Sequence, residues 1–183
     1  MTTVAICGLG GLGSNIAVML TRAGIEKLLL IDHDKVEERN LSRQQYKKAQ
    51  VGEYKTEALK NNLQEINPNV ELKIENAFIT NDNLEAFLKE ADIVCEAFDN
   101  PEAKAMLVNG VLEKFPDKYL VAASGMADLG DPNAIKTKRI SERFFLCGDL
   151  TSELGKNNMY SARVALCAAH QALTVLRIIN KQI

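Results

Sequence analysis

The stretch AICGLGGLGS, residues 5–14, decides the fold class of this chain. An apolar run from Val4 to Cys7 leads into glycines at GxGxxG spacing, and a helical pattern follows. Strand, glycine turn and helix in this order are typical of a dinucleotide-binding unit. Such glycines allow a tight turn and let a phosphate approach the N–H groups at the helix start; a tight turn without a ligand is the alternative. The candidate nucleotide-binding glycines are Gly8, Gly10, Gly11 and Gly13.

The rest of the chain alternates between two apolar periodicities. Helical spacing runs from the glycine turn to Gly24, and the buried run Leu28–Ile31 ends at Asp32. Further helices are predicted over 55–67, 84–88, 102–115 and 161–180, and further strands over 70–74, 92–98, 119–124 and 134–140. This alternation predicts an α/β, Rossmann-like fold with a mostly parallel sheet, helices on both faces and an antiparallel extension near the C-terminus.

Composition narrows the function classes. With 183 residues, 46% hydrophobic and 25% charged, the chain is predicted to form a single domain over 1–183. A net charge of −2 provides no field that would attract nucleic acid or anionic lipid. No apolar run reaches the roughly 20 residues that span a bilayer, and the start lacks a signal peptide pattern. We therefore expect a cytoplasmic protein with neither nucleic acid nor membrane as partner.

The four cysteines form no CxxC pair, and only two histidines accompany them, so no zinc site is predicted. Cys7 and Cys95 fall in predicted strands and Cys167 in a predicted helix, where cysteine usually acts as a small buried hydrophobe. Cys147 precedes a polar segment, Gly148 to Asn158, that is a candidate mobile loop. On sequence alone it is the one chemically available thiol.

Asp32 and the residues after it form the second candidate binding region. An acidic residue at the end of the second strand meets the ribose hydroxyls in such folds, although a solvated strand end is the alternative. Up to this point an NAD-dependent oxidoreductase fits. The continuation DHDKVEERNLSRQ adds a polar cluster of Asn40, Arg43 and Gln44, for which a dehydrogenase has no need.

These residues resemble the ThiF/MoeB-type sulfur-carrier adenylyltransferases, relatives of the ubiquitin-activating enzymes. The hallmark motifs GxGGLG, DxDxV and NLxRQ are present in order and spacing. The likeness continues through Val51–Lys55, Ile66–Pro68 and Phe98–Asn100 and spans the whole chain. It is greatest to the short form of ThiF from thiamine biosynthesis, including the segments FFLCGD and AAHQAL.

The resemblance implies an enzyme that uses ATP to adenylate the C-terminal glycine of a small ubiquitin-like sulfur carrier ending in Gly-Gly, with release of pyrophosphate. It implies a homodimer, with ATP and Mg²⁺ as cofactors. By resemblance, Arg43 and Lys55 bind the triphosphate and Asp99 serves the Mg²⁺. Asn40 and Gln44 then position phosphate or backbone beside it.

The residue types suit these roles independently of the resemblance. Arg43 offers a planar fork for phosphate oxygens, and Lys55 offers a compact point charge. Taken singly, both are solvated surface charges. Asp99 is alternatively the N-cap of the helix that begins at Pro101, and Asn40 and Gln44 alternatively brace a turn.

Three departures from the family pattern leave questions open. The paired CxxC zinc motifs of longer relatives are absent, and the sequence begins at the first strand without the helical segment that lends an arginine to the partner subunit's ATP site. Any of Arg22, Arg139, Arg143 and Arg163 is available to replace that arginine. Some relatives form a covalent link through a loop cysteine, and Cys147 is the candidate nucleophile here. An NAD-dependent oxidoreductase and a catalytically inactive nucleotide- or partner-binding relative are the rival interpretations.

Overall fold

The computed structural model describes residues 1–152 and 158–183. One seven-stranded sheet has the order β3-β2-β1-β4-β5-β7-β6, and every neighbouring pair is parallel except β6 with β7. The reversal of strand order between β1 and β4 leaves a crevice at the carboxyl ends of these strands, which is where open α/β sheets bind ligands. The strands are β1 (Val4–Cys7), β2 (Lys27–Asp32), β3 (Glu71–Asn76), β4 (Ile93–Glu96), β5 (Tyr119–Ala123), β6 (Lys136–Arg139) and β7 (Phe144–Gly148).

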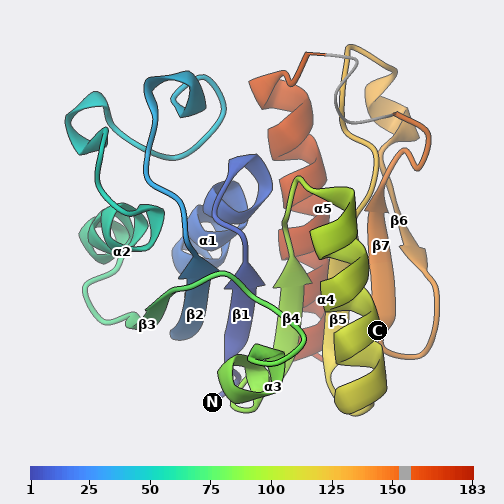
Figure 1. Cartoon of the computed structure of the whole chain (residues 1–183). Helices are drawn as coiled ribbons and strands as arrows, with labels where there is room; N and C mark the ends of the chain where they lie inside the picture. The colour runs from blue at the N-terminus through green and yellow to red at the C-terminus, as the bar shows by residue number, and fades with distance from the viewer. Residues whose placement is uncertain (153–157) are drawn as a thin grey trace.

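Helices cover both faces of the sheet (Figure 1). In that view α3 and α4 lie in front, and α1, α2 and α5 lie behind. The long connections after β2 and β5 rise above the carboxyl ends of the strands. The helices are α1 (Gly11–Arg22), α2 (Lys55–Ile66), α3 (Leu84–Leu88), α4 (Pro101–Lys114) and α5 (Ser161–Ile179), with short 3-10 helices over Glu38–Asn40, Lys48–Gln50 and Pro132–Ala134.

Two hydrophobic cores result from the alternation of side chains along the strands. In β1, Val4 and Ile6 join the core beneath α1, α2 and α5, whereas Ala5 and Cys7 join the core beneath α3 and α4. All four residues are fully buried. Because a parallel strand covered on both faces needs apolar residues at every position, the continuous runs VAIC and LLLI could be recognised in the sequence.

The expected fold class is confirmed, including the antiparallel extension formed by β6. β7 is an additional strand, which was not among those predicted from the sequence. β7 is a short run, Phe144–Gly148, bounded by charged and glycine residues, and its pairing with β5 over Leu120–Ala123 supplies the missing signal. The apolar residues Phe144–Cys147 are the local signal that could have identified this strand.

Two further elements differ from an ordinary interior strand and helix. β6 is an edge strand, and all four of its residues, Lys136, Thr137, Lys138 and Arg139, are exposed. α5 is long and apolar enough, by length and composition, to cross a membrane. Half of that window is buried within the fold, and α5 packs most extensively on α1, so the packing of the core accounts for its apolar composition.

Candidate nucleotide-binding site

A cavity of about 350 Å³ opens at the carboxyl ends of β1, β2 and β4. This volume lies in the usual range for small-molecule sites. The predicted site residues that it brings together are up to 91 positions apart, from Gly8 to Asp99, and its lining extends to Met159. Of the predicted site residues it is lined by Gly8, Gly10, Gly11, Asp32, Asn40, Arg43, Gln44, Lys55 and Asp99.

The glycine turn brings backbone close to backbone. Gly8 has φ +90° and donates its N–H to the carbonyl of Ile31 at 2.9 Å. A Cβ on Gly13 would lie 1.8 Å from the carbonyl oxygen of Gly8, so Gly13 serves the packing of the turn and does not line the cavity. A Cβ on Gly10 would meet nothing nearer than Gln44 Nε2 at 3.7 Å. The space above Gly10 is therefore open at the start of α1, where the first N–H groups have no intrahelical acceptor.

Asp32 is fixed by two backbone groups. Its Oδ2 accepts the N–H of Leu9 at 2.6 Å, and its Oδ1 accepts the N–H of Asp34 at 2.8 Å. Each carboxylate oxygen carries two lone pairs, so acceptor capacity remains on the cavity side. The solvated strand end considered from sequence is wrong, because Asp32 is 8% exposed.

Lys55 is buried and is not a solvated surface charge. Its side chain is 7% exposed, and Nζ lies 2.8 Å from Asp34 Oδ2. Burial alone would raise the pKa of Asp34, but the hydrogen bond from Lys55 and the charges of Lys55, His33 and Arg39 together lower it. Asp34, which the sequence analysis did not single out, was marked by its place in the DxDxV motif.

In the NLxRQ segment, one side chain stabilises the local turn and others keep polar groups available at the cavity. Asn40 Oδ1 accepts the N–H of Glu37 at 2.9 Å, which is the turn-bracing role considered from sequence. Among the described residues, Arg43 Nη1 donates to two oxygens of the same segment, the Arg39 carbonyl at 3.3 Å and Ser42 Oγ at 3.5 Å. Gln44 is buried, and its Oε1 has no hydrogen-bond partner among the described residues. The Gln44 amide thus retains hydrogen-bonding capacity beside the open space at Gly10.

Asp99 is exposed and lines the cavity after β4, and it is not the N-cap of α4. Asn100 takes that role, because its Oδ1 accepts the N–H of Ala103 at 2.9 Å. A buried ion pair supports this wall: Lys104 Nζ lies 2.9 Å from both carboxylate oxygens of Glu96 and 2.8 Å from the carbonyl of Phe98. Burial raises the pKa of Glu96, and the charge of Lys104 opposes that shift. Within residues 1–152 and 158–183, the Asp99 carboxylate makes no hydrogen bond or ion pair.

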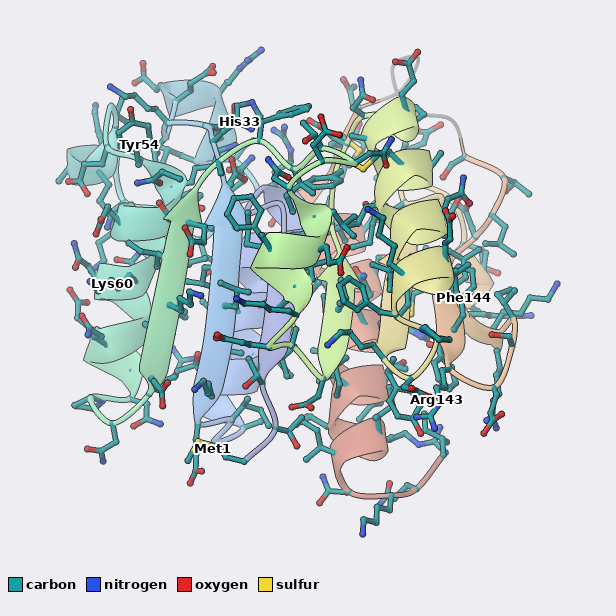
Figure 2. All side chains as sticks on the ribbon, turned by 60° about the horizontal axis from the view of Figure 1, so that its bottom comes forward. Met1, His33, Tyr54, Lys60, Arg143 and Phe144 are labelled. Atoms are coloured by element: carbon teal, nitrogen blue, oxygen red, sulfur yellow. The ribbon has the colours of Figure 1, made fainter. Side chains whose placement is uncertain are left out.

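Another part of the cavity wall is apolar. Ala77, Phe78 and Ile79 line it after β3, together with Phe98. The rings of His33 and Phe78 meet edge to face, with centroids 4.9 Å apart. Figure 2 shows His33 at the end of the sheet opposite Met1. Apolar and aromatic side chains on a cavity wall suit a planar base.

Cys147 does not meet the expectation of an available thiol. It is fully buried in β7, and it does not line the cavity. Burial raises the pKa of its thiol, although hydrogen bonds with Thr137 and Thr174 oppose the shift. A buried thiol with a raised pKa is a poor nucleophile. The sequence analysis went wrong because it missed β7; part of the loop that it expected after Cys147, residues 153–157, lies outside the described residues.

A second buried ion pair connects the segments on either side of that gap. Arg163 Nη2, in the first turn of α5, lies 2.6 Å from Asp149 Oδ2, and its Nη1 donates to the carbonyl of Gly130 at 2.6 Å. Asp149 Oδ1 also accepts the N–H of Thr151 and Ser152. Burial opposes ionisation of Asp149, but these hydrogen bonds together hold its pKa well below the usual range.

Fold and site together define a Rossmann-like α/β protein with a nucleotide-type pocket. The chain belongs to the ThiF family, whose model matches residues 1–182, which confirms the resemblance seen in the motifs.

Two sets of relatives are informative. Ubiquitin-like modifier-activating enzyme 5 of Caenorhabditis elegans is 42% identical over 118 residues, 58% of this chain and 28% of that protein. The Gallus gallus enzyme is 44% identical over 119 residues, 58% of this chain and 30% of that protein. This chain therefore matches less than a third of the length of either relative.

Among solved structures, E. coli tRNA N6-threonylcarbamoyladenosine dehydratase TcdA in complex with ATP has a TM-score of 0.89 at 21% identity, covering 99% of this chain and 86% of that chain. This likeness shows the fold. E. coli MccB with AMPCPP and MccA has a TM-score of 0.77 at 26% identity, covering 98% of this chain and 56% of that chain.

Proposed function

We propose that this protein uses ATP to adenylate the C-terminal glycine carboxylate of a small ubiquitin-like sulfur carrier ending in Gly-Gly, releasing pyrophosphate. The observation that carries the proposal is the meeting of three groups in one cavity: Asp32, the cations Arg43 and Lys55, and the open N-terminus of α1. Each suits a different part of a nucleoside triphosphate. In this proposal Asp32 binds the ribose hydroxyls, and the helix N-terminus with both cations binds phosphate oxygens.

The chemistry explains why fixed positive charge is needed. A carboxylate is a poor electrophile, so it must first be joined to AMP. One of its oxygens attacks the α-phosphorus of ATP, and the bond from that phosphorus to the oxygen bridging to the β-phosphorus breaks. Negative charge then accumulates on the departing pyrophosphate. Cations held in place before the reaction stabilise that charge without reorganisation. Lys55 is held in this way by Asp34.

Magnesium accompanies the triphosphate in this proposal, with Asp99 as its protein ligand. The carboxylate is exposed at the cavity and is not used to cap α4. Magnesium commonly takes one or two carboxylates together with phosphate oxygens, so this single residue fits. When bound, the ion offsets phosphate charge.

Relatives support a protein or peptide tail as the acceptor. The C. elegans and Gallus gallus relatives are named as activating enzymes for a ubiquitin-like modifier, and MccB was solved with both a nucleotide analogue and MccA. Thiamine thiazole synthesis, the pathway we propose, rests on the likeness to the short form of ThiF. A homodimer is part of the proposal, and we expect light scattering to report twice the chain mass.

Carrier-dependent exchange of labelled pyrophosphate into ATP tests the proposal. The protein is incubated with ATP, Mg²⁺ and a Gly-Gly-ended carrier, with a carrier whose last glycine is replaced by a bulky residue as control. We expect exchange with the first carrier and none with the second. An inactive relative would bind ATP without exchange, and an oxidoreductase would bind a nicotinamide cofactor instead.

A further inference from the structure

The position and contacts of each arginine determine which of them can reach a phosphate bound in the cavity. All arginines of the chain lie within the described residues. None of the four considered from sequence lines this cavity. Arg163 is buried with Asp149, Arg143 donates to the carbonyl of Asp117, and Arg139 donates to the carbonyls of Ser141 and Glu142. Arg22 lines a separate cavity between α1 and α2. The arginines that line the nucleotide-type cavity are Arg43 and Arg39, and the sequence analysis did not consider Arg39.

Arg39 presents its guanidinium fork to a carboxylate. Nε lies 2.5 Å from Glu37 Oε2, and Nη2 donates to Glu37 Oε1 at 3.2 Å. Both partners line the cavity, and their side chains are 79% and 54% exposed. This two-point geometry is the one with which arginine also binds phosphate oxygens.

The carboxylates around Arg39 favour its charged form. The hydrogen bond to Glu37 is the main cause of a raised pKa of Arg39, and the carboxylates of Asp34 and Asp99 add to it. Arg39 lines the same cavity as Asp34, which holds Lys55, and as the proposed magnesium ligand Asp99. Its own backbone carbonyl accepts Arg43 Nη1, which places the two arginines side by side on one turn.

The pairing with Glu37 is easily exchanged. An ion pair between two exposed side chains contributes little to stability, because water screens both partners. A triphosphate offers several oxygens and more charge than one carboxylate, so it competes well for the same fork.

We propose that Arg39 is a second phosphate-binding arginine of this cavity and that it exchanges the Glu37 carboxylate for oxygens of the outer phosphates of a bound nucleoside triphosphate. The inference rests on the proposed function. Arg39 supplies, from the same subunit, a cation directed at the leaving pyrophosphate, and Glu37 is the partner that occupies it while no nucleotide is bound.

Titration calorimetry with ATP and with AMP, each in the presence of Mg²⁺, tests the inference. For Arg39→Gln we expect ATP binding to weaken by about tenfold, the effect of losing one charge-assisted contact, while AMP binding changes by less than about twofold. Arg39→Lys keeps the charge but not the fork, and we expect an intermediate affinity for ATP. Glu37→Gln removes the competing carboxylate, and we expect ATP binding at least as tight as in the wild type.

Arg177→Ala is the matched control, because Arg177 is exposed on α5 and does not line the cavity. Thermal unfolding verifies that each variant is folded. Wild-type binding of ATP with unchanged affinity in Arg39→Gln would overturn this inference and leave the proposed function intact. Equal weakening for ATP and AMP would also overturn it. Failure of the wild type to bind ATP would remove the proposed function itself.

Discussion

Lys55 is joined to Asp34 twice: its backbone N–H donates to the Asp34 carbonyl at 2.9 Å, and its Nζ lies 2.8 Å from Asp34 Oδ2. Asp34 in turn donates its own N–H to Asp32. One short segment therefore fixes both the proposed ribose-binding carboxylate and a proposed phosphate-binding cation. The backbone and the side chain of Asp34 together restrain Lys55, and the backbone N–H of Asp34 restrains Asp32.

Lys55→Met tests the role of that cation. The methionine keeps the buried stem filled, and Asp34 remains half exposed to water, so we expect the free energy of unfolding to change by no more than about 1 kcal/mol. Pyrophosphate exchange should fall by about 100-fold or more, since a fixed charge at the transition state is lost. Lys60→Met, on the outer side of the same helix (Figure 2), is the control and should retain exchange. Full activity of Lys55→Met would exclude the assigned role.

Two glycines of one turn should behave differently when replaced by alanine. Gly13→Ala places a Cβ 1.8 Å from a backbone oxygen, so we expect a protein that is strongly destabilised or unfolded. Gly10→Ala meets only the far end of Gln44, so it should fold but obstruct the approach of a phosphate. Thermal unfolding and ATP titration measure the two effects. Normal ATP affinity in Gly10→Ala would show that phosphate does not approach there.

Substitutions of Asp99 and Asn100 distinguish the proposed magnesium-ligand role of Asp99 from the helix-capping role of Asn100. Asn100→Ala removes the N-cap of α4, and we expect a loss of about 1 kcal/mol in the free energy of unfolding. Asp99→Ala should leave stability unchanged within about 0.5 kcal/mol but suppress Mg²⁺-dependent exchange. Urea unfolding and a magnesium titration of the exchange rate measure both. The opposite pattern would return Asp99 to the capping role.

Asp149 should make stability depend on pH. Its folded-state pKa is depressed, so as pH falls the unfolded chain takes up the proton first, and stability that is present above about pH 4 is lost below it. At pH 7, Asp149→Asn leaves the buried Arg163 without a countercharge, and we expect a loss of about 3 kcal/mol. Urea unfolding between pH 7 and pH 3 should show the two proteins converging at low pH. A constant difference would mean that the ion pair is not its source.

Much of the fold could be predicted because it depends on local signals. Parallel strands covered on both faces give continuous apolar runs, and the glycine turn marks the first crossover. β7 was not predicted, because its short apolar run follows closely on the polar edge strand β6; its pairing with β5 identifies it. Because β7 was missed, Cys147, which lies in that strand, was wrongly predicted to be an accessible thiol.

The candidate site was predictable in its motif residues but not in their partners. Arg43, Lys55 and Asp99 are marked by motif order, and the structure places all three on one cavity. The roles of Asp34 and Glu37 depend on which side chains meet across a turn, and a sequence pattern does not state that. Arg39 was overlooked for the same reason: only its position on the cavity wall distinguishes it from a surface arginine.

The exposed cations of β6 affect whether the sheets of two molecules can pair edge to edge. A strand at the margin of a sheet offers unsatisfied backbone groups to any other strand. If the β6 strands of two molecules paired, Lys136, Lys138 and Arg139 of one molecule would lie close to the same residues of the other. The mutual repulsion of these side chains opposes growth of the sheet from one molecule into the next, which protects a crowded solution of the protein from fibrous association.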